Sequence, residues 1–188
     1  MSFQKKYLKY KNKYLDLKNQ LAQKGGATSI MSTRVKRDID KIHREGDANG
    51  IMIMDGDSPN KFTAFIMGPL DSPYADRQLE FSIELPASYP MEPPKIKAIS
   101  RIYHPNIIST RDPDMSQEQA ATTGTDLGAI CLNIFKGEWS PVLTLLSSLI
   151  SIQQLLADPN PDDPLEQGIA ELYKTNRPEF NRRAKAFI

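Results

Sequence analysis

Tyr103-His104-Pro105-Asn106 predicts a rigid turn, because proline fixes φ at about −65° and pushes the preceding histidine toward extended geometry. A turn of this kind holds neighbouring side chains still. Farther along, Ile130-Cys131-Leu132-Asn133-Ile134 places the only thiol of the chain in an apolar run, just after the turn-prone residues 124–128. Taken alone, the thiol stays ambiguous, since a cysteine between Ile and Leu is more often a small buried hydrophobic residue than a nucleophile.

Five more short motifs accompany these two stretches, and the order of all seven along the chain matters more than any single motif. They are Met67-Gly68-Pro69, Ser72-Pro73-Tyr74, residues 89–94 (YPMEPP), Trp139-Ser140-Pro141 and residues 159–165 (PNPDDPL). In this order the motifs resemble the catalytic domain of the ubiquitin-conjugating enzyme family, over roughly residues 32–188. Each tripeptide alone carries little information, but a chance match through the whole ordered set is very improbable.

The hydrophobic pattern around the motifs predicts an α+β domain. A short amphipathic helix is expected from about residue 32, where apolar residues recur at helical spacing. Four apolar segments separated by turn formers predict an antiparallel meander: residues 51–54, 62–67, 79–85 and 96–99. A long helix is expected after Pro141, up to about Ala157, with further helices near residues 163–174 and 178–187. The resemblance implies the same fold: an N-terminal helix, a four-stranded antiparallel meander, a long central helix and C-terminal helices.

The resemblance also implies a reaction. Family members receive ubiquitin from an activating enzyme on a cysteine sulfur, as a thioester, and deliver it to a lysine, usually with a ligase. Cys131 is then the nucleophile, since a thiolate exchanges with a thioester near neutral pH with little help. Asn106 matches the family's residue that stabilises the developing oxyanion or holds the loop that does so, the alternative being an asparagine that only binds its own loop. Asp163 matches the carboxylate that orients the incoming lysine and favours its deprotonation.

Other residues of the expected site have supporting roles. In the family's turn the histidine is structural, so His104 and Pro105 are expected to support the backbone rather than act on the thiol. Asn133 stands two residues after the cysteine, where relatives frequently carry aspartate, and so removes a negative charge from the active-site gate. Asp76-Arg77 is a second departure, since relatives often have paired glycines there.

The loop between the predicted turn and the cysteine is longer than is common in the family, and residues 110–128 are identified as an insertion. Closure entropy alone tolerates such a length easily. Two interpretations stay open for it. It is either an inert surface loop or a lid or substrate-selecting element beside the thioester.

Partner surfaces follow from the resemblance as well. The first helix is expected to help dock the activating enzyme through three basic residues, namely Arg34, Lys36 and Arg37. The same helix and two loops are expected to bind ligases, with Met91 in one loop and Ser140-Pro141 in the other, because an exposed methionine at a turn fits an interaction anchor. Ile150 matches an apolar position that holds donor ubiquitin over the thioester, and a core role for it is equally open.

The first 31 residues form a separate region of different composition. Residues 1–24 hold seven lysines against Asp16 alone, a net charge of +6, which leaves −5 for the remaining residues of a chain whose formal charge is +1. Aromatic and leucine residues recur there along one stripe of a predicted helix, which Gly25-Gly26 ends as a hinge. This helix is either loosely tethered and solvated, or serves self-association, partner docking or an acidic membrane surface. Residues 6–14 resemble leaders of proteins from very large DNA viruses, which suggests a viral origin.

Composition excludes several other classes of protein. A hydrophobic content of 39% and a net charge of +1 favour a soluble globular protein over a nucleic-acid or membrane protein. One cysteine and two histidines at unrelated spacings form neither a disulfide nor a metal cluster. No bound cofactor is expected, since ATP is consumed upstream by the activating enzyme. The cytoplasm or nucleus is the expected location, in a host cell if the origin is viral.

Three alternatives to an active ubiquitin-conjugating enzyme are considered. An inactive ubiquitin-binding variant is disfavoured because Cys131, Asn106 and Asp163 are all present. Conjugation of another ubiquitin-like modifier is disfavoured because residues 139–141 and 159–165 look like the ubiquitin branch of the family. A cysteine protease would need a histidine base, which the turn at His104 is not expected to provide.

Overall fold

The computed structural model describes residues 33–109, 126–135 and 137–187. The predicted N-terminal helix, with its viral resemblance, and most of the predicted insertion therefore lie outside the described residues. The elements follow the chain as α2 (Thr33–Glu45), the short 3-10 turn η1 (Asp47–Asn49), β1 (Ile51–Asp55), β2 (Lys61–Met67), β3 (Gln78–Glu84), β4 (Lys95–Ala98), the 3-10 turn η2 (Asn133–Phe135), α4 (Leu145–Ala157), α5 (Gln167–Thr175) and α6 (Arg177–Phe187).

The four strands form one antiparallel meander in the order β1-β2-β3-β4, which confirms the predicted fold class. The register aligns Ile53 of β1 with Ala64 of β2, Ala64 with Phe81 of β3, and Phe81 with Ala98 of β4. These four residues are buried and share one face of the sheet. Alternation of apolar and polar residues along β3 and β4 puts the core on that face. The strand order leaves β1 and β4 as the two edges of the sheet.

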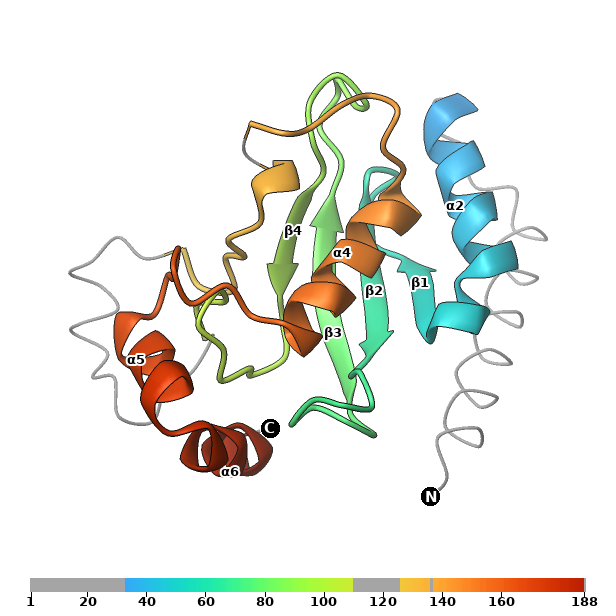
Figure 1. Ribbon diagram of the computed structural model, residues 1–188. Coiled ribbons are helices and arrows are strands. Elements are labelled where there is room, and N and C mark those ends of the chain that lie inside the picture. Colours follow the sequence, from blue (N-terminus) through green and yellow to red (C-terminus); the bar gives the residue numbers. More distant parts are fainter. Residues whose placement is uncertain (1–32, 110–125, 136, 188) are drawn as a thin grey trace. The chain divides into compact units, whose positions relative to one another are not determined.

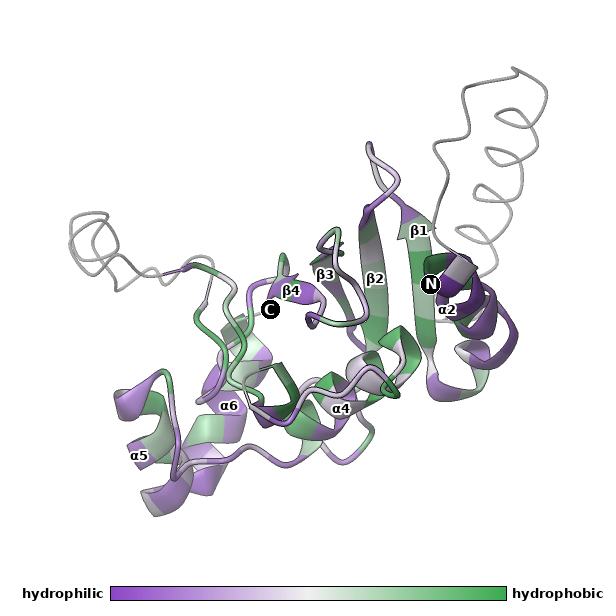
Figure 2. Ribbon diagram, turned by 90° about the horizontal axis from the view of Figure 1, so that it is seen from above, coloured by the Kyte–Doolittle hydropathy of each residue, from purple (hydrophilic) through white to green (hydrophobic). Residues whose placement is uncertain are grey.

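Helices α2 and α4 make the main helical contacts with the sheet, α2 with β1 and α4 with β2, and they also contact each other. Figure 1 shows α4 crossing the sheet, α2 beside β1, and α5 and α6 beyond the β4 side. The colours of Figure 2 place hydrophobic residues along β1, β2 and α4, whereas much of α2 is hydrophilic. The core is therefore a layer between the sheet and α4, and α2 closes it at the β1 edge.

Helix α4 begins at Leu145, later than the expected start after Pro141. The reason is a reciprocal cap: the Thr144 hydroxyl accepts from the Ser147 N–H at 3.2 Å, and the Ser147 hydroxyl accepts from the Thr144 N–H at 2.9 Å. This capping box satisfies main-chain donors at the helix start, so the preceding residues remain in a turn. That turn is where two of the predicted ligase-contacting residues lie.

Candidate active site

The predicted turn and the cysteine stretch lie next to each other in the fold. Ile107 forms bridges with both His104 and Ile130. The main-chain N–H of Cys131 donates to the carbonyl of Asn106 at 2.8 Å. Two stretches separated by the long intervening loop thus meet through backbone hydrogen bonds, which places the thiol beside the rigid turn.

The sulfur of Cys131 lies beside a carboxylate. The residue is buried, with 7% of its surface exposed. Its Sγ lies 3.3 Å from Oδ2 of Asp163, so the thiol can donate to that oxygen. Asp163 is exposed and comes from the loop between α4 and α5. The carboxylate is therefore placed where an amine that approaches the sulfur would meet it.

The side chain of Asn106 joins the turn to this same loop. Its Nδ2 donates to the carbonyl of Asn160 at 2.7 Å and to the carbonyl of Asp163 at 3.0 Å. Its Oδ1 accepts from the Asn160 N–H at 2.9 Å. Asn106 is 1% exposed, so its side-chain amide is shielded from water and relies on these bonds to satisfy its polar atoms. The main chain adds two bonds, from the N–H groups of Leu165 and Glu166 to the carbonyl of Pro105, at 2.9 and 3.0 Å.

The ring of His104 is buried and neutral, with both nitrogens in use. Nε2 lies 2.9 Å from the carbonyl of Leu155, which can only accept, so Nε2 carries the hydrogen. Nδ1 then accepts from the Asn106 N–H at 3.0 Å. Burial lowers the pKa of His104 to about 4. Because the basic nitrogen already serves the backbone of the turn, this geometry favours the structural role over a general base.

Asn133 is exposed at the start of η2. Its Nδ2 donates to Oε1 of Glu138 at 3.4 Å, and its carbonyl accepts from the Glu138 N–H at 3.2 Å. The position that lacks the family's aspartate therefore has a carboxylate next to it from another residue. Sequence reasoning did not identify Glu138, because nothing in the sequence shows that the chain turns back there.

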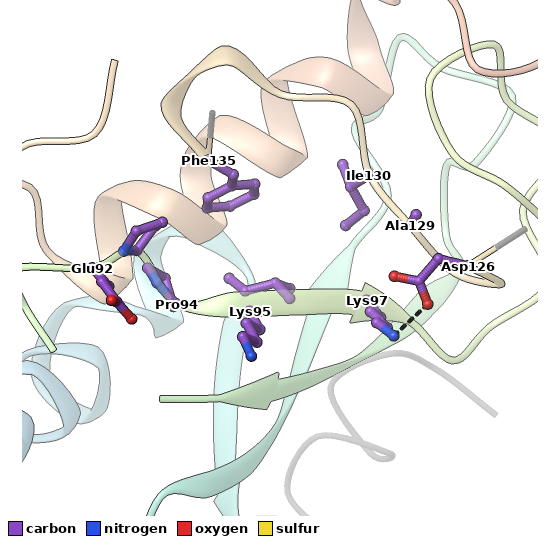
Figure 3. A pocket seen from close by; sticks show the side chains of 10 residues that line it. Glu92, Pro94, Lys95, Lys97, Asp126, Ala129, Ile130 and Phe135 are labelled. Carbon is purple, nitrogen blue, oxygen red and sulfur yellow. Dashed lines mark hydrogen bonds and ion pairs between the residues drawn. The ribbon is translucent and has the colours of Figure 1, made fainter. Parts of the chain in front are cut away.

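A groove of about 550 Å³ lies between β4 and the segment that leads to the cysteine. Figure 3 shows Lys95 and Lys97 of β4 on one side and Ile130 and Phe135 on the other, with Lys97 paired to Asp126. The mixed charges of its lining give the groove no preference for an anionic or a cationic ligand.

The end of the predicted insertion belongs to the domain. The Gly128 N–H donates to the carbonyl of Ile108 at 3.0 Å, and the Gly128 carbonyl accepts from the Ala98 N–H at 2.8 Å. Its φ is +80°, and an added Cβ would lie 2.3 Å from the Ala98 carbonyl oxygen, so glycine is required here. The last residue of the predicted insertion thus joins the edge strand β4, three residues before the cysteine.

The residues predicted to meet partner proteins lie on the surface with one partial exception. Lys36, Arg37 and Pro141 are exposed, and Ser140 and Ile150 are half-buried. Met91 is 74% exposed. Arg34 differs, because its guanidinium makes contacts within the protein. The half-buried position of Ile150 is compatible both with a role in the core and with a contact to donor ubiquitin.

Comparisons with known proteins agree with this fold. The family model of the ubiquitin-conjugating enzymes matches residues 34–111 and 125–188. The structure of a ubiquitin conjugating enzyme E2 domain from Toxoplasma gondii superposes with a TM-score of 0.67 at 35% sequence identity, covering 82% of this chain and 93% of the other. The chain belongs to the ubiquitin-conjugating enzyme family. The family model leaves residues 112–124 unmatched, within the segment predicted to be an insertion.

Two kinds of feature are absent from the residues that the structure describes. No helix there is both long and apolar enough to cross a membrane. The same residues include no cluster of three or more His, Cys, Asp or Glu side chains that could hold a metal ion.

Proposed function

We propose that this chain carries ubiquitin as a thioester on Cys131 and transfers it to a lysine of a substrate protein. The observation that supports this most directly is the 3.3 Å approach of the Cys131 sulfur to the Asp163 carboxylate, beside a turn that Asn106 and His104 hold in place. A nucleophile, a carboxylate and a rigid amide thus occupy one site in a protein of this family.

The chemistry follows in two steps. In the first, the Cys131 thiolate attacks the thioester carbonyl carbon on the activating enzyme, a new C–S bond forms, and the activating enzyme's thiolate leaves. In the second, the neutral amine of a lysine attacks the new thioester, an isopeptide C–N bond forms, the C–S bond breaks and the Cys131 thiolate leaves, while the proton that the attacking nitrogen gives up passes to solvent water. Asp163 accepts or orients the proton that the ammonium must lose before attack, and the amide of Asn106 holds the Asp163 loop or stabilises the oxyanion.

The modifier is proposed to be ubiquitin rather than a related protein. This rests on residues 139–141 and 159–165, which look like the ubiquitin branch of the family. The proposed partners are ubiquitin, a ubiquitin-activating enzyme, a ligase and substrate lysines, in the cytoplasm or nucleus. ATP is proposed to be consumed only by the activating enzyme, with no cofactor bound to this chain.

The test is incubation of the full chain with ubiquitin, a recombinant ubiquitin-activating enzyme and ATP, followed by a non-reducing gel. We expect an adduct that a thiol reductant removes, and none with Cys131→Ala. Parallel incubations with small ubiquitin-like modifiers and their own activating enzymes test the other modifier class. Charging of the Cys131→Ala variant, or charging only by another modifier, would overturn the proposal.

A further inference from the structure

Helix α2 carries an acid on its buried face. Val35, Ile39 and Ile42 form the apolar stripe that packs against the domain, and Asp38 falls on the same stripe. Asp38 is only 2% exposed. A carboxylate is costly to bury unless charged and hydrogen-bonded partners surround it, so its partners show what it stabilises.

Two side chains from different parts of the chain meet Asp38. Nε of Arg34, one helical turn earlier, lies 3.0 Å from Oδ2 of Asp38, and the Arg34 side chain is itself 24% exposed. The hydroxyl of Tyr89, from the loop between β3 and β4, donates to the same oxygen. Burial, together with the Asp38 hydrogen bond, raises the pKa of Tyr89 above its usual range, so the phenol stays protonated and remains a donor.

The rest of the Arg34 guanidinium reaches a second loop. One terminal nitrogen donates to the carbonyl of Pro141 at 2.8 Å, and the other donates to the carbonyl of Leu143 at 2.6 Å. One planar fork thus joins a carboxylate on α2 to two main-chain oxygens just before α4. A lysine has a single ammonium nitrogen at the end of its stem and cannot reproduce that spread of donors.

The two loops are also joined directly. The indole N–H of Trp139 donates to the carbonyl of Pro90 at 2.8 Å, and the rings of Trp139 and Tyr89 lie 6.2 Å apart, centre to centre. We call residues 85–94 the Met91 loop and residues 137–144 the Val142 loop. Figure 1 shows both loops at the end of the sheet beside the start of α2.

Each of the two loops carries one exposed apolar side chain. Met91 is 74% exposed and Val142 is 84% exposed. Large apolar side chains that are this exposed are typical of residues that contact a partner protein. Their relative positions depend on main-chain segments that Arg34, Asp38 and Tyr89 hold.

We propose that Arg34, Asp38 and Tyr89 are positioning residues that lock α2, the Met91 loop and the Val142 loop into one partner-binding surface. This inference rests on the proposed function, in which a ubiquitin-activating enzyme is the partner that docks on α2, the helix whose start lies beside the two loops. Arg34 acts through the loops that it holds, and its charge is not itself the recognised feature. The hydrogen bonds and the ion pair described above for Arg34, Asp38 and Tyr89 involve only α2 and the two loops, so the chemistry at the sulfur is expected to be independent of them.

The substitution that separates these roles is Arg34→Lys, which keeps the positive charge but loses the fork. Its matched control is Arg44→Lys, the same change on the same helix at an exposed position. Tyr89→Phe is a second, milder test, because it removes only the hydroxyl that binds Asp38. Amide hydrogen exchange of the full chain reports the loops directly at Met91, whose N–H donates to the Ser88 carbonyl, and at Leu143, whose N–H donates to the Ser140 carbonyl.

For Arg34→Lys and Tyr89→Phe we expect faster exchange at Met91 and Leu143, and unchanged exchange at Asn106 and Cys131. In steady-state charging with recombinant ubiquitin-activating enzyme, we expect the KM for this chain to rise roughly tenfold with little change in kcat. Discharge of the preformed thioester to free lysine should match the parent. Arg44→Lys should leave exchange, KM and discharge unchanged.

Parental exchange or parental KM in both Arg34→Lys and Tyr89→Phe would overturn the proposal, as would an equal rise in KM for Arg44→Lys. The exchange measurement needs no partner. If the parent chain fails to charge at all, the proposed function fails, whereas the locking of the loops is still tested by exchange.

Discussion

Asn106 donates a 3.0 Å hydrogen bond from its side-chain amide to the main-chain carbonyl of Asp163, the residue whose carboxylate reaches the sulfur of Cys131. The amide predicted to act on the oxyanion therefore also holds the residue predicted to receive the lysine. Both amide hydrogens are used on this loop, through Asn160 as well as Asp163. These contacts favour loop positioning as the role of Asn106 before the substrate arrives.

Replacing Asn106 by Ala should leave charging intact and slow discharge of the thioester to free lysine by roughly 10²-fold or more. Loss of the amide frees the loop that presents Asp163 and removes any donation to the oxyanion. The measurement is single-turnover discharge followed on a non-reducing gel. Asn49→Ala is the matched control, because that amide binds an exposed main-chain carbonyl far along the chain from the site. Parental discharge by Asn106→Ala would exclude both roles.

Replacing Asp163 by Asn should slow discharge to lysine by roughly 10² at neutral pH, since the ammonium loses the carboxylate that favours its deprotonation. Discharge to hydroxylamine, an amine that is already neutral at pH 7, should be affected much less. Asp162→Asn is the matched control: its carboxylate pairs with Lys174 at 2.7 Å rather than facing the sulfur. Equal losses for the two amines, or for the two aspartates, would contradict the assigned role.

The buried imidazole of His104 predicts a pH dependence of folding. Its pKa falls from 6.5 to about 4 in the folded protein because burial disfavours the charged ring. Between these values the unfolded chain binds a proton that the folded chain does not, so stability rises with pH there. The contribution is fully present above about pH 6.5 and is lost as pH falls toward 4, by on the order of 3 kcal/mol in total.

Urea unfolding of the parent and of His104→Gln at pH 7.5 and pH 5 measures this effect. Glutamine offers a donor and an acceptor but does not titrate, and the carboxylates are common to both proteins. We expect the parent to lose more stability than the variant between the two pH values. An equal loss would mean that His104 contributes nothing to the pH dependence.

Asp76 adopts a φ of +61°, the left-handed region that L-residues enter at a cost. Replacing it by Gly should raise the free energy of unfolding by about 0.5 to 1 kcal/mol, because glycine reaches this region without the steric penalty. Asp76→Ala removes the same carboxylate and keeps the penalty, so it should not stabilise. Thermal or urea unfolding of the three proteins decides the matter, and a stabilisation by Ala equal to that by Gly would show that the carboxylate, not the backbone, is responsible.

Patterns that act over a few residues predicted much of this structure. Apolar segments separated by turn formers located all four strands to within one residue of their observed ends, because buried strands are rich in apolar residues and end where the chain turns. Apolar residues at helical spacing located α2, because one face of that helix is buried. The start of α4 was placed too early, because the apolar run that suggests a helix does not reveal that Thr144 and Ser147 cap each other. The departure at Asp76-Arg77 did coincide with a turn that needs a left-handed residue.

For the candidate site, the sequence pointed to the residues themselves but not to their hydrogen-bond partners. Residue types and motif order were sufficient to select Cys131, Asn106 and Asp163 and to show the family, because each belongs to a short motif readable along the chain. The partners of these residues are distant in sequence and depend on how the sheet and helices pack. The Asn160 carbonyl that binds Asn106, the Leu155 carbonyl that sets the tautomer of His104, and the tyrosine that meets Asp38 across the α2 interface are all of this kind. Hydrogen bonds between segments that are remote in the chain leave no periodic pattern in the sequence. Only the tertiary structure therefore decided that the Arg34 guanidinium binds groups of its own protein, whereas Lys36 and Arg37 remain on the surface.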